Sequence, residues 1–307
     1  MRRAASYRLA AARSIEHPPD CRHTTIRRAA WEPAAATDLR EEGSWSSGDK
    51  LLLALRLFTP DRPVWSVEAI AGALAVSLST AYRYVRSLVG AGLLDPVDGQ
   101  GGYVLGPAVI EFDRTIRLSD PVLRAALPSI RWLARQLDGR STLLLCRLYQ
   151  DTVMCIHQER PGDRAPLVSY ERGRPMPMFR GAASKAILAH LPPRQLRRIH
   201  RRFADAIADA GLAGGWEAFR DGLAAIRKSG VCVAAGELDP GVVGIAAPVF
   251  AAPVPATGRQ VLGSLSIAHP GPLDEPALAR TVGLLNAAAR EIDAAIRVAV
   301  DGRAGHA

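Results

Sequence analysis

The chain has 307 residues, of which 48% are apolar and 22% charged, and its net charge is +9. This ordinary globular composition leaves room for two domains and a tail. No apolar run approaches the ~20 residues of a membrane span. The arginine-rich first residues lack the apolar core of a secretory signal, although an amphipathic targeting segment stays open. We expect a cytoplasmic protein, and its positive charge suits a polyanionic partner.

The four cysteines are widely and irregularly spaced, at Cys21, Cys146, Cys155 and Cys232. No CxxC pair occurs, so a zinc ribbon is not expected, and the sequence suggests no metal and no cofactor. Mostly buried, reduced thiols are the simplest interpretation and agree with a cytoplasmic location.

Residues 1–46 are rich in Ala, Arg, Pro and Ser and keep no lasting periodicity. The stretches HPPD and WEPAAATD interrupt any helix there. We therefore expect a disordered tail. It is either a basic arm that lies near DNA or an extension without function.

From Asp49 the pattern becomes helical. DKLLLALRLFTP predicts a short buried helix that ends at Thr59-Pro60. Ser66 offers an N-cap for a second helix, VEAIAGALAVS, with Glu68 at the positive end of its dipole. After a turn, Ser77 or Ser79 can cap a third helix. Its expected inward residues are Ala81, Val85, Leu88 and Val89.

A hairpin follows the third helix. Gly90 to Gly92 end that helix, and then LLDPVD and YVLG predict two strands joined by the glycine-rich loop GQGG. The order helix, helix, turn, helix, hairpin predicts a winged helix-turn-helix over residues 47–106.

The third helix carries no acidic residue from Ser77 to Leu94. Acidic side chains would be repelled by phosphate, whereas hydroxyl and guanidinium groups can contact base edges and the backbone of DNA. The candidate DNA-binding residues are Ser77, Ser79, Thr80, Tyr82, Arg83 and Arg86. The alternative is a solvated helix that happens to lack acidic residues. The charges over residues 49–110 balance, so the DNA-binding hypothesis depends on where the arginines point.

Residues 107–120 predict a linker helix, and residues 121–301 an α/β domain with mostly antiparallel strands and outer helices. The overall expectation is an α+β chain. The expected strands contain STLLLCRLY, TVMCIHQE, APLVSY, VCVAAGEL, VVGIAAPVF and QVLGSLSIA. The expected helices contain PVLRAALPSIRWLARQLD, GAASKAILAHL, PPRQLRRIHRRFADAI, GWEAFRDGLAAIRKSG and DEPALARTVGLLNAAAREIDAAIRVAV.

Four stretches of the chain, in this order, resemble the IclR family of bacterial transcriptional regulators. They are SVEAIAGALAVSLSTAYRYVRSLVGAGLL, GRPMPMFRGAASKAILA, SGVCVAAGELDPGVVGIAAPVF and VLGSLSIAHPG. The resemblance covers about residues 48–300. It implies DNA binding, homodimers or homotetramers, and a GAF-like domain that binds a small organic acid effector.

The resemblance also implies where the effector lies, namely against the helix that follows the Pro-rich loop and against the last strands. Carried over by motif, the effector-binding residues are Val168, Ala182, Ala183, Val242, Gly244, Ser266 and Ala268. A helix N-terminus offers unpaired N–H groups for a carboxylate. Ordinary packing is the alternative for each residue, above all for Val168 and Val242.

The chain departs from the family pattern at four of these motif positions. Phe179 and Ser184 stand where His and Gly are frequent, Gly244 where some members have Cys, and Ala268 where others have Ser. These departures predict a less polar pocket, so the effector is expected to be a more apolar or aromatic acid.

The sequence is compatible with three functions. The first is a ligand-responsive regulator that binds a palindromic operator as a dimer. The second is an enzyme on the α/β domain, with Cys155, His157 and Glu159 as candidates because they alternate along one strand and would share a face. His190 and His200 flank a basic helix but have no acidic partners at metal-binding spacing. The third is a structural DNA-binding protein without an effector. We expect the first and no enzymatic activity.

Overall fold

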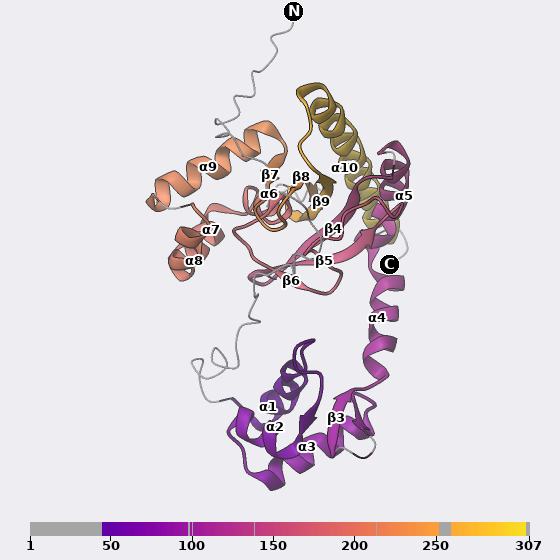
Figure 1. Cartoon of the computed structure of the whole chain (residues 1–307), viewed down its shortest axis with the longest axis vertical. Helices are drawn as coiled ribbons and strands as arrows, with labels where there is room; N and C mark the ends of the chain where they lie inside the picture. Colours follow the sequence, from indigo (N-terminus) through magenta and orange to yellow (C-terminus); the bar gives the residue numbers. More distant parts are fainter. Residues whose placement is uncertain are drawn as a thin grey trace, which may run out of the picture. The chain divides into compact units, whose positions relative to one another are not determined.

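The computed structural model describes residues 45–97, 99, 101–137, 139–212, 214–251 and 259–304, of which only the backbone is described for 300–304. The expected tail, apart from its last two residues, and Cys21 lie outside the described residues. The described elements form two groups, each with its own hydrophobic core (Figure 1).

The N-terminal group contains three α-helices, a 3-10 helix and three short strands. They are α1 (Ser47–Leu53), η2 (Ala54–Leu57), β1 (Trp65–Ser66), α2 (Val67–Leu74), α3 (Leu78–Gly90), β2 (Leu94–Val97) and β3 (Gly102–Leu105). The expected caps are present, because the Ser66 hydroxyl accepts from the N–H of Ala69 and the Ser77 hydroxyl from that of Thr80. The predicted winged helix-turn-helix is confirmed.

Three details of this group differ from the sequence expectation. The first helix holds no buried residue in its α-helical part, and Ala54 and Leu57 of the 3-10 continuation are buried instead. On α3, Tyr84 is buried rather than Val89, and its hydroxyl lies 2.8 Å from that of Ser47. The wing gains a third strand, because β1 pairs with β3. With only two residues, β1 is too short to show the apolar alternation that would predict a strand from the sequence.

The C-terminal group follows α4 (Ala108–Ser119), which is helical as predicted. Its strands are β4 (Thr142–Tyr149), β5 (Thr152–Glu159), β6 (Pro175–Met176), β7 (Cys232–Ala235), β8 (Val242–Phe250) and β9 (Val261–Pro270). Its helices are α5 (Pro121–Gln136), α6 (Ala182–Leu188), α7 (Pro193–Arg202), α8 (Ala204–Asp209), α9 (Gly215–Ser229) and α10 (Glu275–Ala304).

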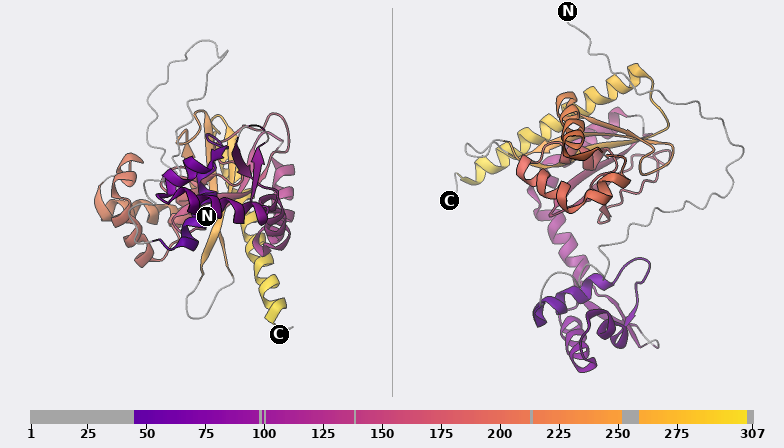
Figure 2. Two further views of the ribbon diagram at one scale, coloured as in Figure 1. Left: turned by 90° about the horizontal axis from the view of Figure 1, so that it is seen from below. Right: turned by 90° about the vertical axis from the view of Figure 1, so that its left-hand side faces the viewer.

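The six strands form one sheet in the order β6-β5-β4-β9-β8-β7, and the paired strands are antiparallel, as predicted. The long helix α10 packs with α5 on one face of this sheet (Figure 2). The other face carries α6 and the core that α7, α8 and α9 help to close. The sheet therefore has a hydrophobic core on each side.

One predicted strand is wrong. The segment APLVSY, which includes Val168, is an irregular loop rather than a strand. The backbone N–H of Ser169 donates to the Asp239 carboxylate at 3.0 Å, so this loop is tied to another loop instead of a ladder. The predicted basic helix is also divided, into α7 and α8 at Phe203.

Two statements about absent features hold for the described residues alone. There, no helix has the length and apolar character needed to cross a membrane. In the same residues, no three His, Cys, Asp or Glu side chains gather in a way that would hold a metal ion.

Candidate DNA-binding and effector sites

The helix α3 exposes the face that the sequence nominated. Ser79, Tyr82, Arg83 and Arg86 are exposed, and Tyr82 exposes 51% of its surface although it is a large aromatic residue. Thr80 is half-buried. The opposite face packs into the core through Ala81, Tyr84, Val85 and Leu88. A surface-exposed helix of this kind is what a major groove can admit.

The first turn of α3 is held by hydroxyl groups. Besides capping the helix, the Ser77 hydroxyl lies 3.0 Å from that of Ser79 and 2.9 Å from that of Thr80. Ser77 is thus engaged in shaping the helix start. Its neighbours keep hydroxyl hydrogen-bonding capacity for an outside partner.

The guanidinium groups of Arg83 and Arg86 have no hydrogen bond or ion pair within the part of the chain that the structure describes. Since no acidic residue lies on α3, nothing on the helix neutralises them. The arrangement leaves two positive charges on an exposed helix face, which suits phosphate or guanine edges.

In the C-terminal group, all seven residues nominated for the effector line one small cavity. Its volume is about 40 Å³. The lining residues come from the loop before β6, the start of α6, the loop before β8, and strands β4, β7, β8 and β9. The residues that also line it but were not predicted from the sequence are Leu144, Tyr170, Gly181, Ala234, Glu237, Leu238, Asp239 and Ile267. We call this space the effector cavity.

Glycine is required at the start of α6. Gly181 has φ +80°, and a Cβ there would lie 2.5 Å from Cδ1 of Leu238. The small side chains of Ala182 and Ala183 follow directly, so the first turn of the helix stays open to the cavity.

Two serines of β9 differ in their bonding. Ser264 and Ser266 share a face of the strand and are both buried. Ser264 Oγ donates to the carbonyl oxygen of Ala183 at 3.0 Å. Ser266 Oγ, which lines the cavity, has no hydrogen-bond partner among the described protein atoms. A buried hydroxyl without a partner is costly, and this one belongs to a residue that lines the cavity.

Two carboxylates also line the cavity. The sequence had instead suggested that the N–H groups at the start of α6 are free to bind a ligand. Glu237 Oε2 accepts from the Gly181 N–H at 2.9 Å, and its other oxygen pairs with Lys185. Asp239 accepts from Ser169. Part of the α6 terminus is therefore occupied by the protein's own acid. Glu237 and Asp239 both lie in the GELDPG stretch before β8. The two acidic residues beside a turn are the feature of the sequence that could have indicated them as cavity residues.

The departures from the family pattern lie partly outside the cavity. Ser184 is buried on α6 and bonds the Tyr170 hydroxyl at 2.7 Å, which fixes one cavity wall. Burial raises the pKa of Tyr170 far above its ordinary value, so the hydroxyl stays protonated. Phe179 packs against Phe203 and Phe219 instead of facing the cavity.

The residues proposed for catalysis do not form a nucleophile–base pair. Cys155 is buried, and its thiol donates to the His157 carbonyl oxygen at 3.1 Å, while the His157 ring lies 3.3 Å from the Glu159 carboxylate. The thiol of the neighbouring Cys146 is held in its protonated form, since hydrogen bonding to Cys155 and burial raise its pKa. No base contacts either sulfur in the described residues.

An exposed, acid-free helix of a winged helix-turn-helix, joined to a domain with an internal cavity, defines a DNA-binding regulator of two domains. Comparison with family models agrees. Residues 47–98 match the IclR helix-turn-helix domain, and residues 118–294 match the C-terminal domain of bacterial IclR transcriptional regulators. The chain belongs to the IclR family of transcriptional regulators, and the predicted family is confirmed.

Individual relatives give the same assignment. The chain is similar to the HTH-type transcriptional regulator Rv1719 of Mycobacterium tuberculosis, at 30% identity over 62% of this chain and 74% of the relative. It is also similar to the HTH-type transcriptional regulator KipR of Bacillus subtilis, at 24% identity over 71% of this chain and 84% of that protein. Both relatives are regulators rather than enzymes.

A solved structure shares the fold. An IclR homolog from Microbacterium hydrocarbonoxydans, complexed with 4-hydroxybenzoate, superposes with a TM-score of 0.63 at 22% identity. The match covers 82% of this chain and 100% of that one. At this identity the likeness shows the fold alone.

Proposed function

We propose that the protein is a cytoplasmic regulator that binds a palindromic operator through α3 and responds to a small organic acid in the effector cavity. The observation that carries the DNA-binding assignment is the exposed face of α3, with two guanidinium groups that have no acidic partner among the described residues. Arg83 lies nearer the helix start, where side chains reach base edges, and Arg86 lies one turn later. We assign base recognition to Arg83 and phosphate contact to Arg86.

The division into domains supports this proposal. The boundaries 47–106, 107–120 and 121–301 remain those expected from the sequence. Separate hydrophobic cores on either side of the linker helix α4 are consistent with two units that can change their arrangement. An effector acts through different affinities for two such arrangements.

Self-association is supported by α4. Four large apolar side chains of this helix are exposed, at Ile110, Phe112, Ile116 and Leu118. The exposed fraction of Ile110 reaches 73%. Apolar surface of this extent on one helix favours burial against another chain. We propose a homodimer or homotetramer, whose two-fold symmetry matches a palindromic operator.

The lining of the effector cavity favours a ligand with an apolar part. Leu144, Val168, Val242 and Ala268 surround the unpaired Ser266 hydroxyl. A cavity of about 150 Å³ admits benzene, whereas this one measures about 40 Å³. An aromatic acid such as 4-hydroxybenzoate therefore enters when the irregular loops that carry Val168 and Leu238 move apart. Such a movement couples ligand binding to conformation.

The DNA-binding proposal is tested by titrating full-length protein with DNA from upstream of its own gene and with unrelated DNA. Arg83→Ala should reduce the preference for specific DNA by about 1–3 kcal/mol. Arg86→Ala should weaken both DNAs alike and lower the salt dependence. Arg280→Ala, an exposed arginine on α10, is the charge-matched control and should change neither. If both α3 variants bind like the wild type, α3 does not contact DNA.

The effector proposal is tested by calorimetry with benzoate, 4-hydroxybenzoate, pyruvate and glyoxylate. We expect the aromatic acids to bind more tightly. Their binding should also change the affinity for specific DNA. A preference for pyruvate or glyoxylate contradicts the aromatic assignment, and unchanged DNA affinity with every acid contradicts the effector role.

A further inference from the structure

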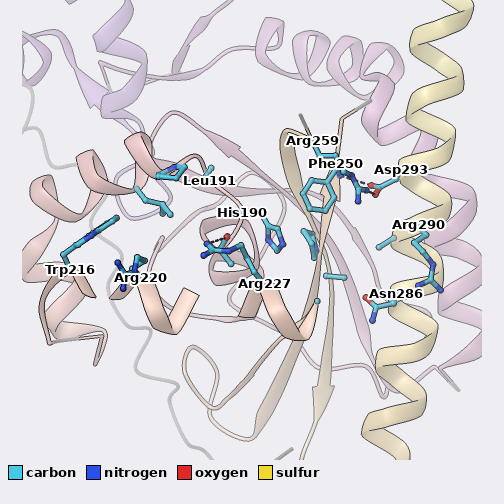
Figure 3. Close-up of a pocket in the computed structure, with 17 residues that line it drawn as sticks. His190, Leu191, Trp216, Arg220, Arg227, Phe250, Arg259, Asn286, Arg290 and Asp293 are labelled. Carbon is cyan, nitrogen blue, oxygen red and sulfur yellow. Dashed lines mark hydrogen bonds and ion pairs between the residues drawn. The ribbon is translucent and has the colours of Figure 1, made fainter. Parts of the chain in front are cut away.

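A second, larger pocket opens at the edge of the six-stranded sheet (Figure 3). Its volume is about 690 Å³, within the range of small-molecule sites. It shares no lining residue with the effector cavity. We call it the edge pocket.

The pocket exists because β7 is short. This edge strand pairs with β8 only from Val243 to Ala246, so the end of β8 from Ala247 to Phe250 has a strand, β9, on one side only. Helices α9 and α10 contribute the two flanks, and Figure 3 shows Trp216 and Arg220 on one side and Asn286 and Arg290 on the other.

The uncovered end of β8 cannot accept another strand. Pro248 has no backbone N–H, and the Phe250 N–H donates to Oδ1 of Asp293 at 2.8 Å. An edge without free donors does not extend a sheet. A ligand in this pocket must therefore be recognised by side chains.

Those side chains carry an excess of positive charge. Four guanidinium groups line the pocket, on Arg220, Arg227, Arg259 and Arg290. Arg220 pairs with Asp221 at 3.0 Å, and Arg259 pairs with Asp293. Arg227 donates to a backbone carbonyl, and Arg290 has no partner within the described chain. Two positive charges thus have no acid opposite them.

Aromatic and polar groups lie between these charges. The guanidinium group of Arg259 lies over the ring of Phe250, with its central carbon 4.2 Å from the ring centre, and His190 meets the same ring edge-on at 5.2 Å. His190 Nδ1 donates to a carbonyl oxygen at 2.9 Å, so the neutral ring keeps a lone pair on Nε2. The Asn286 amide has no hydrogen bond among the described residues.

We propose that the edge pocket is a second small-molecule site, which binds a flat organic dianion. One acidic group pairs with Arg227 and the other with Arg290. The flat body contacts Phe250 and His190, which lie between these arginines in Figure 3. Guanidinium groups recognise carboxylates well, and aromatic side chains favour a flat partner. The inference is independent of the effector proposed above, because the two sites have no residue in common.

The test uses full-length protein and calorimetry with terephthalate, benzoate and sulfate as probes. Terephthalate carries two carboxylates on a ring and should bind most tightly. Arg290→Gln should weaken it about tenfold, the loss typical of a charged hydrogen bond. Arg290 is exposed and has no partner to lose, so this variant should fold normally. Arg280→Gln removes an exposed charge from the same helix outside the pocket and should leave the affinity unchanged.

Several results would overturn the assignment. One is the absence of terephthalate binding at millimolar concentration, and another is equal affinity for sulfate, which would indicate charge attraction alone. Loss of terephthalate binding in Ser266→Ala but not in Arg290→Gln would move the ligand to the effector cavity. If Arg290→Gln changes the oligomeric state in sedimentation but not the affinity for terephthalate, this face is an interface between copies of the chain and not a ligand site.

Discussion

Two serines of β9 offer an unusually direct test of the effector cavity, because their substitutions should change stability in opposite directions. Ser264→Ala removes a buried hydrogen bond of 3.0 Å to the Ala183 carbonyl oxygen, which should cost about 1 kcal/mol of unfolding free energy. Ser266→Ala removes a hydroxyl that is 3% exposed and has no hydrogen-bond partner in the described part of the chain. Its removal should stabilise the protein by about 1 kcal/mol, or less where water in the cavity satisfies the hydroxyl.

The two variants control for each other. Both remove one hydroxyl from the same face of the same strand, so strand propensity and buried area cancel, and the expected difference is about 2 kcal/mol. Urea unfolding of each variant measures it, provided that the denaturant slope does not change. In calorimetry with the acid that binds wild type most tightly, Ser266→Ala should weaken binding about tenfold. An equal loss of stability in both variants would refute the reasoning, since Ser266 would then have a partner.

Three further predictions concern stability. Tyr84→Phe loses the 2.8 Å hydrogen bond to Ser47 and should lower the free energy of unfolding by about 1 kcal/mol, measured by urea denaturation. Gly263→Ala places a Cβ 2.0 Å from a carbonyl oxygen of β4 and should cost about 3 kcal/mol, whereas Gly222→Ala on α9 meets nothing within 4 Å and should not destabilise. Burial lowers the pKa of His190, so the folded state resists its protonation and stability should fall as the pH drops from 7 to 5; His190→Gln should show a smaller loss in thermal melts across that range.

Much of the N-terminal group could be predicted from the sequence. The caps Ser66 and Ser77 and the inward residues Ala81, Val85 and Leu88 follow from patterns that act over three or four residues. Such patterns are local, so they survive without knowledge of the rest of the chain. They also indicated which face of α3 is exposed, and the lack of acidic residues on that face indicated contact with DNA. The resemblance to a family supplied the candidate effector-binding residues.

Tertiary structure decided what the local pattern left open. Apolar alternation in APLVSY predicted a strand, but Asp239, 70 residues away from Ser169, holds it as a loop. The seven nominated cavity residues share one space only because several distant segments converge there. Ser264 and Ser266 look equivalent in sequence, and only the approach of α6 gives one of them a partner. Likewise, the edge pocket depends on where β7 stops. Periodicity shows which residues face inward, whereas long-range packing determines which buried groups remain unpaired and which charges remain without an acid.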